Sequence, residues 1–156
     1  MDNKKLKWCL GLKDGLQIVE PNQRLAKAYF AEAKSSLERA EKNLKDHDLL
    51  WTTVVLYYAE YYSLYAFLQS IGVKCENHAC SILAAGYLLG EDKISTINSH
   101  KEKRIDAQYY MKVDQEASVA NMLKEGKSFV SIFDEIVSNV NEEEIKGYRK
   151  DLKNAH

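Results

Sequence analysis

The stretch YYAEYYSLYAF, residues 57–67, decides the fold, because it places five tyrosines in eleven positions of an apolar segment. That segment runs from Leu49 to Ile71 and stops before Gly72, a residue suited to the left-handed conformation that closes a helix. Apolar side chains cover most of the circumference, so we expect a central helix packed on several sides. Tyrosine combines a large apolar ring with one polar end, and packing explains most of the five. We expect Tyr58 and Tyr65 in the core.

Apolar residues at steps of three and four predict further helices on both sides of this segment. One follows Pro21-Asn22, and a shorter one is capped by Asn77. The pattern Ser99-His-Lys-Glu102 is typical of a capping box, which predicts a helix start at Ser99. The expected helices cover residues 22–44, 49–71, 79–89, 99–112 and 114–140, and Asn141 begins a short last one.

These patterns indicate an all-α protein: an up-and-down bundle of four to five main helices plus a short C-terminal helix. Residues 1–20 are expected to form an N-terminal arm, in which Asp14-Gly15 makes a tight turn and Trp8 docks on the bundle. Residues 21–140 form the bundle itself. Residues 141–156 form a short helix or tail.

The composition excludes some classes of function. With a formal net charge of -1 over 156 residues, the chain has no overall attraction to polyanions, so a nucleotide or RNA contact must come from a local patch. The longest apolar region is interrupted by Glu60 and several hydroxyl groups, which argues against a membrane span. The N-terminus lacks the apolar core of a signal peptide, and with an odd number of cysteines this favours a reduced, cytoplasmic protein.

Three potential zinc ligands, Cys75, His78 and Cys80, lie close together in the sequence. A structural zinc site needs paired ligands, and the chain has no second pair at suitable spacing. We therefore interpret the two cysteines as small buried thiols beside a histidine at a helix start, and expect neither a metal nor a cofactor. The chain also lacks a glycine-rich phosphate loop, a nucleophile elbow and a metalloprotease motif.

The stretch SHKEKRIDAQYYMK, residues 99–112, is the strongest candidate for binding chemistry. His100 and Arg104 lie one helical turn apart with Lys101 and Lys103 nearby, so this helix can present a cationic patch to a phosphate. Asp106 shares another face with Tyr110. The alternative is a solvated charged helix with internal ion pairs, which helical periodicity alone favours.

The order of these motifs resembles the HEPN domain family of small helical modules. The resemblance covers about residues 5 to 140. It rests on Pro21-Asn22 with the helix that follows, on residues 56–62 leading to Gly72, on His78, and on residues 104–110. It implies a helical bundle that dimerises about a two-fold axis. Some members of the family cut RNA without metal, and others accompany a small nucleotidyltransferase.

In the nuclease branch of that family an arginine is followed four to six residues later by a histidine. Arg104 stands in the place of that arginine, but Tyr109, Tyr110 and Met111 occupy positions where the histidine would fall. A phenol with a pKa of about 10 is a poor proton acceptor at neutral pH. Tyr61-Tyr62 likewise replaces the aromatic residue and histidine that many relatives carry in the second long helix.

The resemblance therefore predicts a module that binds nucleotide or RNA, or partners a small nucleotidyltransferase in a toxin-antitoxin system, without catalysis of its own. The rival hypothesis is a metal-independent endoribonuclease that uses Arg104 with His100 or His78. A third is a structural dimer, in which Arg104 and Tyr109 are buried or ion-paired. The expected ligand-binding residues are Arg104, Asp106, Tyr109, Tyr110, Tyr62, Lys101 and Lys103.

Overall fold

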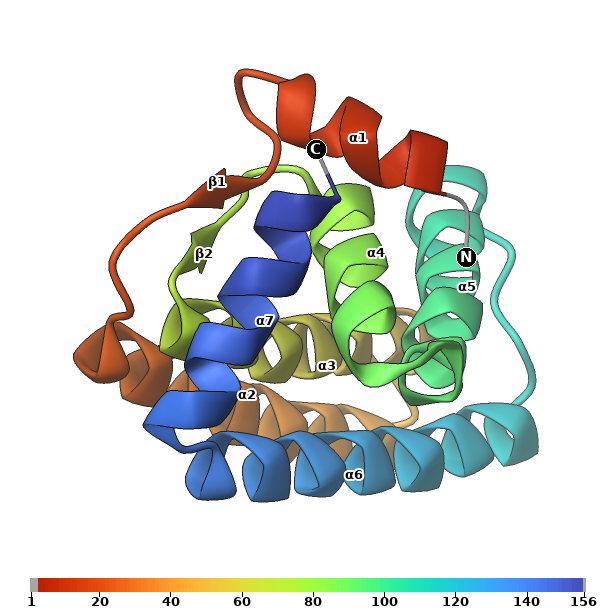
Figure 1. The fold of residues 1–156 in the computed structure, drawn as a ribbon. Helices are drawn as coiled ribbons and strands as arrows, with labels where there is room; N and C mark the ends of the chain where they lie inside the picture. The colour runs from red at the N-terminus through yellow and green to blue at the C-terminus, as the bar shows by residue number, and fades with distance from the viewer. Residues whose placement is uncertain (1–2, 156) are drawn as a thin grey trace.

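The structure, a computed structural model, describes residues 3–155 of the chain, and they are mostly helical (Figure 1). The elements in order are α1 (Asn3–Gly11), β1 (Gln17–Ile18), α2 (Gln23–Lys45), α3 (Leu49–Ile71), β2 (Val73–Lys74), α4 (His78–Leu89), the 3₁₀-helix η1 (Glu91–Lys93), α5 (Ser95–Tyr110), α6 (Glu116–Asn139) and α7 (Glu142–Asn154). The all-α class and the helical bundle are confirmed.

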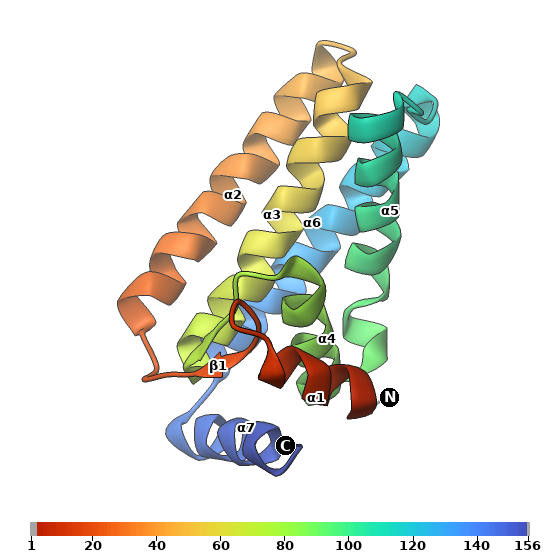
Figure 2. The ribbon, with the colours of Figure 1, turned by 90° about the horizontal axis from the view of Figure 1, so that it is seen from above.

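Helix α3 is the centre of the bundle, as expected. It packs against α2, α4, α5, α6 and α7, and every residue from Ser63 to Ile71 is buried. Figure 2 shows α2 alongside α3, and α1 and α7 near the end where α3 finishes. The core therefore forms around a helix that is apolar on nearly all sides.

The side of α3 that faces the core differs from the expectation at one tyrosine. Tyr57, Tyr61 and Tyr65 are buried, whereas Tyr58 and Tyr62 are half-buried at the edge of the helix. The prediction for Tyr65 is confirmed and that for Tyr58 is wrong. A helix that is apolar all round has little periodic contrast, so its sequence does not fix which side points inward.

Most helix ends follow the predicted signals. Asn22, Asp48, Asn77 and Asn141 each accept a hydrogen bond from the backbone N–H three residues later, which satisfies a free amide of the first turn. Gly72 closes α3 with a φ of 79°. These caps confirm the predicted starts of α2, α3 and α4 to within one residue.

The predicted start of α5 is wrong. The helix begins at Ser95, so residues 99–102 lie inside it and the expected capping box does not form. Ile94 and Ile97 are buried, and removal of their apolar side chains from water favours packing of residues 94–98 against the bundle. The helix ends at Tyr110, and Met111 adopts a left-handed φ of 55°.

The N-terminal segment forms a helix instead of an extended arm. Leu6 and Cys9 bury the inner side of α1, while Trp8 is 59% exposed, so the prediction that Trp8 docks on the bundle is wrong. The predicted turn is confirmed, since the Gly15 amide donates to the Leu12 carbonyl over 3.2 Å. Beyond it, β1 pairs with β2 in an antiparallel ribbon.

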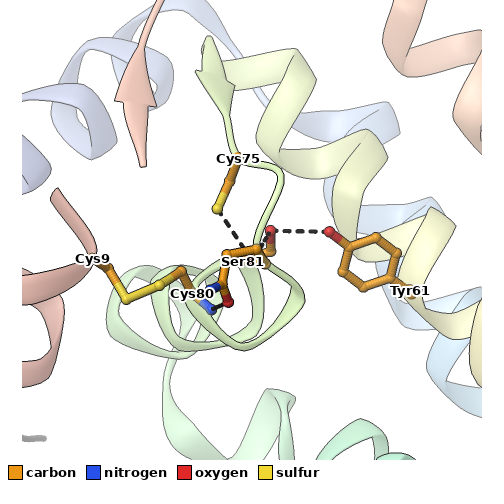
Figure 3. The surroundings of a disulfide bond; sticks show 6 residues. Cys9, Tyr61, Cys75, Cys80 and Ser81 are labelled. Carbon is orange, nitrogen blue, oxygen red and sulfur yellow. Dashed lines mark hydrogen bonds between the residues drawn. A yellow bond between two sulfur atoms is a disulfide. The ribbon is translucent and has the colours of Figure 1, made fainter. Parts of the chain in front are cut away.

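A disulfide joins α1 to α4. Cys9 and Cys80 are bonded across 71 residues of sequence, with Cα atoms 5.6 Å apart (Figure 3). The expectation that Cys80 is a free thiol is therefore wrong, although Cys75 is free and buried. The pairing depends on how α1 folds back across α4, which local sequence signals do not reveal.

Helix α7 is fixed to the bundle by its own contacts. Leu152 is fully buried, and the Arg149 guanidinium donates to the carbonyls of Val19, Ile71 and Gly72. Within residues 3–155, no helix combines the length and the apolar character that crossing a membrane requires.

Candidate functional site

Arg104 extends from α5 onto the aromatic surface of α3. Its Cζ atom lies 4.7 Å from the ring centroid of Tyr57 and 5.9 Å from that of Tyr58. One guanidinium nitrogen donates to the Gln108 side chain over 3.3 Å, but the buried Nε has no hydrogen-bond partner among residues 3–155. Arg104 forms no ion pair with a described carboxylate, so aromatic faces hold the guanidinium without neutralising its charge.

His78, the first residue of α4, reaches the same tyrosines. Its ring stacks on Tyr61 with centroids 3.7 Å apart, and its Nδ1 lies 3.0 Å from the Tyr57 hydroxyl. Burial lowers the pKa of His78, and the positive charges of Arg104 and Lys101 lower it further. His78 is therefore neutral at physiological pH, with a ring that can donate or accept one further hydrogen bond.

Lys101 lies one turn before Arg104 on α5 and is half-buried. Burial lowers the pKa of its ammonium group, and repulsion from Arg104 adds to this effect. Lys101 has no ion-pair partner within the described part of the chain. We call Arg104, Lys101, His78, Tyr57 and Tyr58 the Arg104 cluster.

The charges of the Arg104 cluster favour an anionic ligand. Two cations repel each other in a partly desolvated setting, and no carboxylate among residues 3–155 forms an ion pair with either of them. Burial raises the pKa of Tyr57 to about 12 against the opposing effect of Arg104, so its hydroxyl stays protonated. A phosphate here would meet a planar donor, an ammonium group and an imidazole.

His100, the other histidine that the sequence suggested, lies elsewhere. It is 1% exposed, and its Nδ1 hydrogen-bonds to the buried carboxylate of Glu60 on α3. Its Nε2 lies 3.3 Å from a carboxylate oxygen of Glu125 on α6. His100 thus links three helices and does not join Arg104, although the two residues are one turn apart on α5.

The remaining predicted residues separate into two groups. Lys103 pairs over 2.9 Å with Asp114, which lies beyond the end of α5, so this pair differs from the expected ion pair within the helix. Tyr109 and Tyr110 are 66% and 67% exposed at the end of α5, and neither side chain has a hydrogen bond or ring contact with another described residue. The exposure of Tyr109 and the unpaired charge of Arg104 differ from what the structural-dimer hypothesis predicts.

Neither Tyr62 nor Asp106 forms a ring contact or an ion pair with Arg104. The ring of Tyr62 is 6.1 Å from that of Tyr58, and its other neighbour is Tyr29 of α2 at the same distance. Asp106 is half-buried, and its backbone carbonyl accepts from Lys112. Only Tyr62 extends the aromatic surface.

The sequence did not single out Tyr57 or Gln108. The spacing of four residues between Arg104 and Gln108 on one helix could have indicated their hydrogen bond. Tyr57 could not be found this way, because its part in the site depends on the packing of α5 and α4 against α3.

No cluster of three or more histidine, cysteine or acidic side chains suited to a metal ion occurs among residues 3–155. Cys75, His78 and Cys80 do not converge: Cys80 is bonded to Cys9, and His78 faces the tyrosines of α3. The chain matches no protein-family model, and no curated protein is significantly similar to it.

Proposed function

We propose that this chain is a HEPN-like helical module that binds a phosphate group of a nucleotide or RNA at the Arg104 cluster, without catalysing a reaction by itself. One observation carries the proposal: two cations without ion-pair partners, Arg104 and Lys101, lie beside half-buried and buried tyrosines. Arginine offers a planar donor face that fits phosphate oxygens. Tyr58 is half-buried at the edge of α3, and an aromatic ring can stack on a base.

The binding test uses a single-stranded RNA of about ten nucleotides, a length within the usual range for small single-strand binding domains. We expect isothermal titration to detect binding that Arg104→Ala abolishes or weakens at least about tenfold. Lys101→Gln should weaken the binding less. It should also reduce the slope of log affinity against log salt concentration by about one. Lys103→Gln is the matched control, because this lysine is already paired with Asp114.

Equal affinity of wild type and Arg104→Ala would contradict the proposal. The HEPN-like proposal also includes a homodimer and a small nucleotidyltransferase as partner in a toxin-antitoxin system. Light scattering tests the dimer. Co-purification with a small nucleotidyltransferase encoded beside this chain tests the partner, and failure of both association and RNA binding would remove the proposal.

A second candidate function is metal-independent RNA cleavage, and the approach of His78 to Arg104 favours it. When the imidazole proton is on Nδ1, the Nε2 of the neutral ring can accept the proton of a ribose 2′-hydroxyl. The 2′-oxygen would attack the adjacent phosphorus and break its bond to the 5′-oxygen, which takes a proton from the imidazolium and leaves a 2′,3′-cyclic phosphate. Arg104 would stabilise charge on the phosphate under attack. The test is RNA cleavage in the presence of a chelator, and activity should disappear in both His78→Ala and Arg104→Ala. Intact RNA under these conditions leaves binding as the proposed function.

A further inference from the structure

A groove of about 450 Å³ lies between α1, α4 and α5, next to the Arg104 cluster. Ile82, Leu83 and Ile94 supply aliphatic side chains to its walls. Ala79, which follows His78, and Lys101, which lies one turn from Arg104, also line it. Its size suits a small-molecule site, and Lys101 borders both the groove and the cluster.

The edge of the groove carries Trp8. This indole is 59% exposed although the next residue, Cys9, is buried in the disulfide with Cys80 (Figure 3). The disulfide and the buried Leu6 fix α1 on the bundle, so Trp8 stays at the groove. A large aromatic side chain in such a place offers a flat apolar surface for stacking.

Among residues 3–155, the charged side chains that line the groove have one sign: Lys5 and Lys101 line it, and no acidic residue of this range does. Neither lysine forms an ion pair with a described residue. The groove therefore combines apolar walls, an exposed indole and two unpaired ammonium groups, which complement a ligand with a flat apolar body and a negative group.

We propose that this groove binds a small aromatic phosphate, with the ring against Trp8 and the aliphatic walls and the phosphate at Lys101. The inference rests on the proposed function in one respect, because Lys101 directs the phosphate toward Arg104. It adds a second half to the site: the Arg104 cluster recognises the anion, and the groove recognises the ring.

Three probes separate the two halves: adenosine 5′-monophosphate, adenosine and ribose 5-phosphate. We expect the full-length oxidised protein to bind the monophosphate at least about tenfold more tightly than either fragment in isothermal titration. In a Trp51→Phe background the monophosphate should quench the fluorescence of Trp8. Trp8→Ala should reduce its affinity to that of ribose 5-phosphate, and the exposure of Trp8 makes this variant compatible with folding, which circular dichroism checks.

Each half can fail separately. Equal affinities for the monophosphate and ribose 5-phosphate, with unchanged Trp8 fluorescence, would overturn the groove and leave phosphate binding at Arg104 intact. Quenching of Trp8 that persists at full affinity in Arg104→Ala would support the groove and overturn the proposed function. Absence of binding by all three probes would overturn the groove, and the RNA titration described above then decides phosphate binding at the Arg104 cluster. Lys103→Gln again serves as the control on α5.

Discussion

The guanidinium of Arg104 lies over the ring of Tyr57, 4.7 Å from its centroid, and the hydroxyl of the same ring contacts His78. An aromatic face attracts a cation without neutralising it, in contrast to a carboxylate. Arg104 is thus positioned and still able to bind an anion. The same contact brings a positive charge close to His78.

The first prediction concerns the pKa of His78. Burial lowers it, followed by Arg104 and Lys101, so the folded protein should show a value below 6.5 in an NMR titration of the histidine ring protons. Arg104→Gln removes one positive charge and should raise this pKa, while burial keeps it below the ordinary value. Lys103→Gln should leave it unchanged. An unaltered His78 titration in Arg104→Gln would show that the two side chains are not coupled.

The second prediction concerns the Cys9–Cys80 disulfide. Closing a loop between residues 71 apart restricts the unfolded chain, and loss of the bond should lower the free energy of unfolding by up to about 4 kcal/mol. Urea denaturation with and without reductant measures this difference. The double variant Cys9→Ser/Cys80→Ser should match the reduced protein and respond no further to reductant. Equal free energies of unfolding for the oxidised and reduced protein would contradict the prediction that the disulfide stabilises the folded state.

The third prediction concerns the buried pair of Glu60 and His100. Burial raises the pKa of Glu60 from 4.5 to about 7, although the hydrogen bond to His100 opposes the rise. Burial lowers the pKa of His100, but Glu60 and Glu125 outweigh it, and the net shift is upward. Both groups bind protons more tightly in the folded state, so their contribution to stability is largest at low pH. The contribution of Glu60 to stability is lost as the pH rises from 4.5 to about 7. The contribution of His100 is lost as the pH rises above 6.5.

Urea denaturation between about pH 5 and pH 8 should therefore show a fall in stability with rising pH, of at most about 3 kcal/mol from Glu60. Glu60→Gln keeps an acceptor for the imidazole N–H but cannot titrate, so its profile should be flatter. Superimposable profiles of the two proteins would mean that Glu60 has an ordinary pKa in the folded state.

The fourth prediction compares two glycines inside helices. A Cβ at Gly126 of α6 would lie 2.4 Å from a methyl group of the fully buried Leu56, so Gly126→Ala should destabilise the protein by about 1 to 3 kcal/mol. A Cβ at Gly147 of α7 meets nothing within 4 Å, so Gly147→Ala should stabilise it by about 0.5 to 1 kcal/mol. Thermal melts of the two variants should shift in opposite directions. A shift in the same direction would show that α6 does not pack this closely on α3.

The sequence predicted the fold wherever a local signal was strong. Asn22, Asn77 and Asn141 marked helix starts. The sequence failed at Ser99, where a capping pattern lies inside a helix. It also failed at Tyr58, because a helix that is apolar on all sides does not indicate which side faces the core. In the candidate site it pointed to Arg104, Lys101 and His78, but it could not choose between His78 and His100 as the neighbour of Arg104.

By itself, the amino-acid sequence determined that the chain is helical and that the tyrosine segment is its centre, because helix periodicity, caps and hydrophobicity act between residues close in the chain. Only the tertiary structure decided which side chains contact one another. It placed Arg104 over Tyr57, buried His100 between Glu60 and Glu125, and brought Cys9 to Cys80. The physical reason is that these contacts depend on how separate helices cross and rotate against one another, which no local pattern encodes.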